Sequence, residues 1–153
     1  MKHLSMVLLS IALFAGVGLL LAKESKGATE HRFLNVPGRS DNNPYSNAVL
    51  VGDTLYLAGD IGIDPATGAP PADVKEEVKI LMESMKRRLE MVDMSMDDLV
   101  MVNVHCPDLS LYDDFNEVYR TYFTDHFPAR AFLGSGPLLL GGRFEATAIA
   151  VRQ

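Results

Sequence analysis

The sequence is short of cysteine and of positive charge. Cys106 is the single cysteine among 153 residues, so no intramolecular disulfide can form, and the fold must depend on its core or on assembly with copies of itself. Acidic residues outnumber basic ones by 20 to 14, which gives a formal net charge of −6 at pH 7. Because nucleic-acid affinity comes largely from lysine and arginine, we expect no nucleic-acid partner.

The first 28 residues differ from the rest of the chain. Lys2 and His3 precede an apolar run over residues 4–22, which is the pattern of a secretory signal. The run also approaches the length of a membrane span. We therefore predict that residues 1–28 are a signal peptide or membrane anchor plus linker, cleaved after Ala22 or Gly27 or left uncleaved. The protein would then be exported, periplasmic or secreted, or anchored through residues 4–22, and it would contact a membrane only through this leader.

The remainder, residues 29–153, is predicted to form one domain. Residues 1–28 carry three lysines and one glutamate, so the −6 of the whole chain leaves a formal net charge of −8 on this domain. A length of about 125 residues is enough for a modest core.

Periodicity predicts two helices and a set of strands in this domain. Strands are expected over residues 48–51, 54–58, 99–106, 129–133 and 143–151, and helices over 73–92 and 113–123, after an extended arm over 30–45. Asp73 is the expected N-cap of the first helix, and Glu76 and Glu77 are expected on its charged outer face. This order predicts an α+β fold in which a mixed β-sheet carries two helices on one face.

Arg130 and Glu145 are the charged residues best placed to carry chemistry. An unpaired guanidinium among apolar neighbours would be costly, so Arg130 needs an anionic partner, either a carboxylate of this chain or a substrate carboxylate held at two points. Alternation along the last strand puts Arg143, Glu145 and Thr147 on one face. If that strand pairs with the strand of Arg130, Glu145 could lie near Arg130; a salt bridge of Glu145 with Arg130 or Arg143 is the structural alternative.

Other polar residues show no catalytic or metal-binding pattern. His105 and Cys106 are adjacent on an expected strand and point to opposite faces, so they cannot act as a dyad. Asp60 and Asp64 are assigned to turns. The histidines lack metal-ligand spacing, and Gly134-Ser135-Gly136 leads into a proline rather than into a helix. We therefore expect no metal and no cofactor.

Five short motifs occur in one collinear register over residues 33–152. They are Asn43-Pro44-Tyr45-Ser46, Leu57-Ala58-Gly59-Asp60-Ile61-Gly62, Asp64-Pro65-Ala66-Thr67-Gly68, Phe127-Pro128-Ala129-Arg130-Ala131 and Phe144-Glu145-Ala146-Thr147-Ala148-Ile149-Ala150-Val151. Together they resemble the RidA (YjgF-like) family, also called the endoribonuclease L-PSP family. The resemblance implies a chorismate-mutase-like fold, a homotrimer with sites between subunits, and hydrolysis of reactive 2-imino or enamine acids, such as 2-iminobutanoate and 2-iminopropanoate, to 2-keto acids and ammonia.

The resemblance also implies roles for individual residues. Arg130 would bind the substrate carboxylate, and Glu145 would orient the attacking water. Tyr45 and Gly59 would line the pocket. Such chemistry needs positioning and charge matching rather than a cofactor, because the imine carbon is already electrophilic.

Two pocket positions depart from the family pattern. Ala58 stands where deaminase-type members usually have serine, and Phe132 stands where they usually have cysteine, so both would contact substrate and Phe132 would change the shape of the pocket. A trimer that binds a carboxylate ligand without catalysis is the alternative function. A ribonuclease or translation inhibitor is a further alternative, which the charge of −8 disfavours.

Overall fold

The computed structural model describes residues 29–39 and 42–153, so the predictions about the leader lie outside the described residues. Within these two ranges, no helix is both long and apolar enough to cross a membrane. The signal or anchor role of residues 1–28 and the export that follows from it stay predictions.

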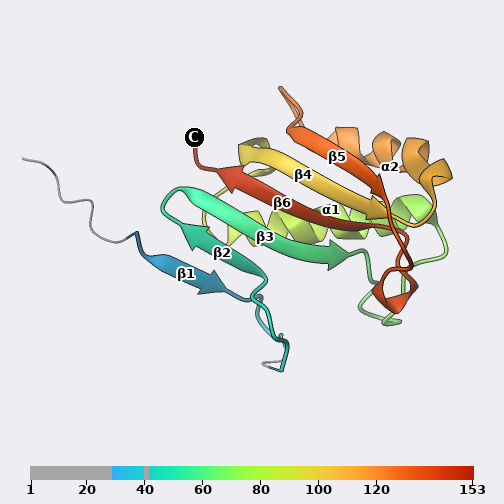
Figure 1. Cartoon of the computed structure of the whole chain (residues 1–153), viewed down its shortest axis with the longest axis horizontal. Coiled ribbons are helices and arrows are strands. Elements are labelled where there is room, and N and C mark those ends of the chain that lie inside the picture. The colour runs from blue at the N-terminus through green and yellow to red at the C-terminus, as the bar shows by residue number, and fades with distance from the viewer. Residues whose placement is uncertain (1–28, 40–41) are drawn as a thin grey trace, which may run out of the picture.

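A six-stranded mixed sheet carries both helices on one face (Figure 1). The strands lie in the order β1-β2-β3-β6-β4-β5, and neighbours are antiparallel except β4 and β5, which are parallel. This arrangement confirms the α+β prediction. The elements are β1 His31–Leu34, β2 Ala48–Val51, β3 Thr54–Ile61, α1 Val74–Glu90, β4 Leu99–Cys106, α2 Tyr112–Tyr119, β5 Ala129–Gly134 and β6 Glu145–Val151.

The core lies between the helices and the sheet, as the helical stripe predicts. Asp73 caps α1, because its side chain accepts the Lys75 N–H at 2.9 Å. The apolar stripe of α1 packs on the sheet, and the buried members of the predicted stripe are Val78, Leu81, Met82, Met85, Leu89 and Val92. Cys106 is fully buried and His105 is half-buried on the next position of β4, which confirms that they point to opposite faces.

Several predicted boundaries are wrong. Residues 31–34 were predicted as part of an arm, but they form β1. Most of their side chains are exposed and give no periodic pattern, because backbone pairing with β2 holds the strand. β3 continues to Ile61, three residues beyond the prediction. The second helix ends at Tyr119 and tightens into a 3₁₀ turn, Arg120–Tyr122. β6 begins at Glu145 rather than at residue 143.

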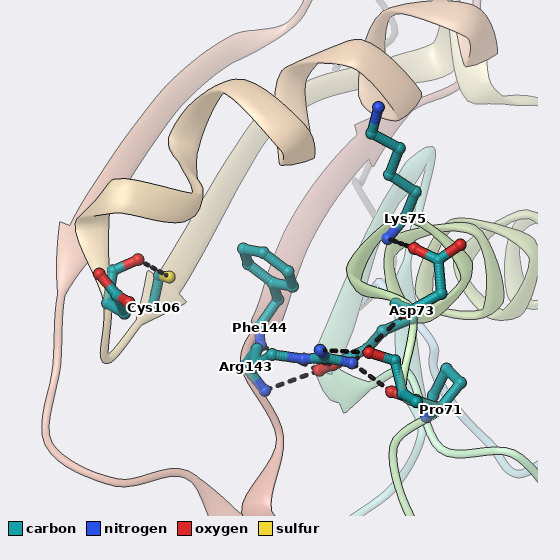
Figure 2. A network of polar contacts seen from close by, with 9 residues as sticks. Pro71, Asp73, Lys75, Cys106, Arg143 and Phe144 are labelled. Carbon is teal, nitrogen blue, oxygen red and sulfur yellow. Dashed lines mark hydrogen bonds and ion pairs between the residues drawn. The ribbon is translucent and has the colours of Figure 1, made fainter.

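Glu77 is the clearest error in the predicted outer face, because its side chain is 0% exposed. Its carboxylate accepts the backbone N–H of Arg143 at 2.7 Å and of Phe144 at 3.2 Å, and it also binds the Nε of Arg143 at 2.5 Å. The Arg143 guanidinium donates to the Ala72 carbonyl oxygen at 3.0 Å and to that of Pro71. Figure 2 shows Arg143 against Pro71 and Asp73 at the start of α1. The chain before β6 is thus tied to α1, so Arg143 does not share a strand face with Glu145.

Candidate active site

Arg130 lies on the helix side of the sheet. It is opposite Val102 in the parallel pair of β4 and β5, and Val102 is fully buried under the helices. The Nη2 of Arg130 donates to Asn116 Oδ1 at 2.7 Å and lies 3.5 Å from the hydroxyl of Tyr112. Its guanidinium carbon lies 4.5 Å from the centre of the Tyr119 ring. Residues of α2 therefore hold the guanidinium in a defined orientation.

No carboxylate of the described residues forms an ion pair with Arg130. Within one protomer the predicted salt bridge of Glu145 with Arg130 or Arg143 is therefore wrong, since Arg143 pairs with Glu77 instead. Among these residues only Nη2 of the Arg130 guanidinium has hydrogen-bond partners. Nε and Nη1 have no partner among these residues and remain available to a substrate carboxylate.

A cavity of about 200 Å³ adjoins the Arg130 guanidinium. The lining residues are Tyr112, Asn116, Tyr119, Arg120, Phe127, Pro128 and Arg130. Burial raises the pKa of the Tyr119 phenol to about 12, against the opposing effect of the positive charge on Arg130. Tyr119 therefore keeps its proton at any physiological pH and can only donate or accept as a neutral hydroxyl.

Phe132 shares the face of Arg130 but is not among the residues that line this cavity. Its ring packs edge-on against Tyr112, with centroids 5.0 Å apart, and against Phe115 at 5.3 Å. Both of those rings lie 5.7 Å from the guanidinium carbon of Arg130. The ring of Phe132 itself lies 5.8 Å from the same carbon. Phe132 is thus one of the aromatic residues around Arg130, and its contact with substrate stays a prediction.

Glu145 lies on the opposite face of the sheet from Arg130. β6 pairs with β3 and β4, so β4 separates it from β5, and Glu145 is opposite His105. Since alternate residues of β4 point to opposite faces, His105 and Glu145 are on the side away from Val102 and Arg130. The prediction that Glu145 could lie near Arg130 required their two strands to pair. Since these strands do not pair, the prediction is wrong within one protomer.

A β-bulge places Gly59 beside Glu145. The register of β3 and β6 shifts between Leu57 and Asp60, which inserts one extra residue into β3. A Cβ atom built on Gly59 would lie only 2.2 Å from Glu145 Oε1. A side chain at position 59 would therefore displace the Glu145 carboxylate, whereas glycine leaves the carboxylate in place.

The same bulge turns Asp60 toward the helices, where it is not a turn residue as predicted. Asp60 pairs with Arg88 of α1 at 2.7 Å, and Arg88 also donates to the carbonyl oxygen of Ala58 at 3.3 Å. Arg88 was not predicted as a buried residue, although its position on the apolar stripe, three residues after Met85, indicates a buried charge that needs a partner.

The loop that carries Tyr45 is joined to the bulge of β3 rather than to the surroundings of Arg130. It precedes β2 in an exposed loop, where the Arg39 guanidinium lies 4.5 Å above its ring. Two residues later, the carbonyl oxygen of Asn47 accepts the N–H of Ala58 at 3.0 Å, which ties this loop to the bulge. The predicted site residues thus form two groups, one around Arg130 and one around the bulge.

In the part of the chain that the structure describes, no cluster of His, Cys, Asp or Glu could hold a metal ion.

Comparison with known proteins connects this geometry to a family. The family model described as endoribonuclease L-PSP matches residues 39–152. The 2-iminobutanoate/2-iminopropanoate deaminase of Bos taurus is 39% identical over 110 residues, which are 71% of this chain and 80% of that protein.

Solved structures agree with the sequence match. A putative endoribonuclease from Thermotoga maritima aligns with a TM-score of 0.73 and 35% identity over 80% of this chain and 98% of that one. E. coli TdcF with bound serine aligns with a TM-score of 0.72 and 29% identity over 80% and 99%. This chain therefore belongs to the endoribonuclease L-PSP family, the RidA (YjgF-like) family that its motifs resemble.

Proposed function

We propose that this protein hydrolyses reactive 2-imino or enamine acids to 2-keto acids and ammonia. The observation that carries the proposal is the Arg130 guanidinium, which Asn116 orients toward a cavity and which no described carboxylate neutralises. A guanidinium held in this way suits a substrate carboxylate. The identity to an imine deaminase supports the same reaction class.

In the proposed mechanism, Arg130 holds the substrate carboxylate and so fixes the imine carbon in the site. Glu145 accepts a proton from water as the water oxygen attacks that carbon. Glu145 passes this proton to the imine nitrogen, which becomes the amine of a tetrahedral intermediate. The hydroxyl group of the intermediate then gives its proton to this amine, the carbon–nitrogen bond breaks, ammonia leaves, and the carbon–oxygen double bond of the keto acid forms. Gly59 contributes by leaving room for the carboxylate of Glu145.

The mechanism requires two copies of the chain, because Arg130 and Glu145 face opposite sides of one sheet. In the described residues no helix covers the face that carries Glu145, and that face exposes large apolar side chains, among them Phe33, Tyr56 and Leu133. A large exposed apolar surface favours self-association. We therefore propose the homotrimer that the family resemblance implies, with each site formed between subunits. Light scattering that reports a monomer at micromolar concentration would rule this out.

Substitution of Arg130 tests the proposed reaction. Lysine keeps the charge but loses the planar fork, so ammonia release from 2-iminopropanoate should fall steeply in Arg130→Lys and further in Arg130→Ala. Loss of this charge-assisted contact should cost about 2–4 kcal/mol of transition-state stabilisation, or roughly a factor of thirty to a thousand in rate. The melting temperature should change little, because Arg130 is only partly buried.

Arg87→Lys is the matched control, because this arginine is exposed on α1 and does not line the cavity. A well-folded Arg130→Ala protein with undiminished imine hydrolysis would remove Arg130 from the mechanism.

Binding of a carboxylate ligand without turnover is the second candidate function. It is favoured by one observation, the amino acid serine bound to the similar E. coli protein TdcF. Under this alternative, small 2-keto acids would bind through Arg130, and no ammonia would be released from any imine.

A further inference from the structure

The cavity beside Arg130 contains a second arginine that the proposed mechanism does not use. Arg120 follows the last residue of α2 and lines the cavity together with Arg130. Neither arginine forms an ion pair within residues 29–39 and 42–153. No acidic side chain of these residues lines the cavity. Both charged residues that line the cavity within one protomer are therefore arginines, in a chain with 20 acidic and 14 basic residues, and this indicates an anionic ligand with more than one charge.

Tyr119 adds an unused hydrogen-bond donor to the same cavity. Its side chain is only 4% exposed, and its hydroxyl is buried without a hydrogen-bond partner among the described residues. A buried hydroxyl without a partner is costly. The neighbouring acceptor, Asn116 Oδ1, already binds Arg130. The polar groups free to bind a ligand are therefore mainly donors, so the ligand must supply acceptors.

The size of the cavity suits a short molecule. Its volume within one protomer is about 200 Å³, below the roughly 300–1,000 Å³ of pockets that hold drug-sized ligands. Phe127 and Pro128 supply an apolar part of the lining, which suits a few methylene groups between two charged ends.

We infer that this cavity selects 2-imino acids of four or five carbons whose side chain ends in a second carboxylate. Arg130 holds the carboxylate next to the imine carbon, and Arg120 holds the distal carboxylate. The hydroxyl of Tyr119 donates to an oxygen of the bound acid. This inference rests on the role of Arg130 in the proposed function and adds the substrate class.

Binding of stable keto acids tests the inference without requiring turnover. Calorimetry on the full-length protein would compare 2-oxoglutarate with 2-oxobutanoate, which lacks the distal carboxylate. We expect 2-oxoglutarate to bind at least about tenfold more tightly, as one added charge-assisted contact allows. Arg120→Gln should bring the ratio of the two affinities close to one. Arg120 is exposed, so the variant should fold, and Arg87→Gln is the control that removes a remote positive charge.

Ammonia release from 2-iminoglutarate and 2-iminopropanoate, measured in parallel, separates failure of the inference from failure of the proposed function. A preference for 2-oxoglutarate that depends on Arg120 supports the inference even if no imine is hydrolysed, in which case only the catalytic proposal fails. Hydrolysis of 2-iminopropanoate with equal affinity for both keto acids overturns the inference and leaves the proposed function intact. A preference that persists in Arg120→Gln, or no binding of either keto acid, also overturns it.

Discussion

Replacing Glu77 by alanine should destabilise the protein more than almost any other change of a charged residue. The Glu77 carboxylate is fully buried and accepts three hydrogen bonds, two from the backbone of Arg143 and Phe144 and one from the Arg143 side chain. Alanine would leave the buried N–H of Phe144 without an acceptor and the guanidinium without its anion. The chain that leads into β6, and with it Glu145, would lose its attachment to α1.

The expected magnitude follows from these contacts. Breaking a buried ion pair by removing one partner costs about 3–5 kcal/mol, and an unpaired buried N–H alone costs about 1–3 kcal/mol. These costs overlap, and the Arg143 side chain is 26% exposed and can regain water, so we expect about 3 kcal/mol for Glu77→Ala. Glu77→Gln should cost less, about 1–2 kcal/mol, because the amide oxygen can still accept both backbone N–H groups.

Urea and thermal unfolding of the full-length protein measure these differences. A loss of about 3 kcal/mol corresponds to a fall in melting temperature of roughly 10 °C for a chain of this size. Glu76→Ala is the matched control, because Glu76 is the exposed neighbour whose only described ion pair is with Lys79 at 3.6 Å, and it should change stability by less than about 0.5 kcal/mol. Equal stability of Glu77→Ala and Glu76→Ala would refute the reasoning.

Three further changes have defined outcomes. Gly59→Ala puts a Cβ atom where Glu145 Oε1 lies. The rate of imine hydrolysis should therefore fall by about tenfold or more, with a modest loss of stability. Unchanged kinetics would contradict the placement of Glu145. Burial raises the pKa of the Cys106 thiol, so iodoacetamide at pH 8 should label it slowly in the native protein and rapidly in urea; fast native labelling would show the thiol to be accessible. The pKa of Tyr119 rises from 10.0 to about 12 on folding. The stabilisation linked to the neutral phenol is therefore present below pH 10 and is lost as the pH rises to 12. Tyr119→Phe should lose less stability than the unchanged protein over this pH range, and identical pH profiles would count against the buried hydroxyl.

The sequence by itself determined the parts of the fold that depend on local pattern. The stripe of α1, the N-cap at Asp73 and the strand over residues 99–106 agree with the structure because each follows from the spacing of residues within one element. The sequence also indicated the family, because the short motifs are specific together and in order, although no single motif is specific. Arg130 was identified as needing a partner from its apolar neighbours alone.

Only the tertiary structure decided which charged residues are buried and what they bind. Glu77 and Arg88 lie at helical spacing from the apolar stripe of α1, but sequence pattern could not show that each has a partner from a distant segment, Arg143 for one and Asp60 for the other. The Asp60 partnership further depends on a bulge in β3, and one extra residue reverses the face of every side chain that follows it.

The placement of Arg130 and Glu145 depends in the same way on strand order. Alternation along each strand is a local property, so it could place Glu145 relative to Thr147. It could not place Glu145 relative to Arg130, because that relation depends on β4 lying between β5 and β6 and on the register of both pairs. Hydrogen bonds between segments far apart in the chain set this order, and they put the two residues on opposite faces of one sheet.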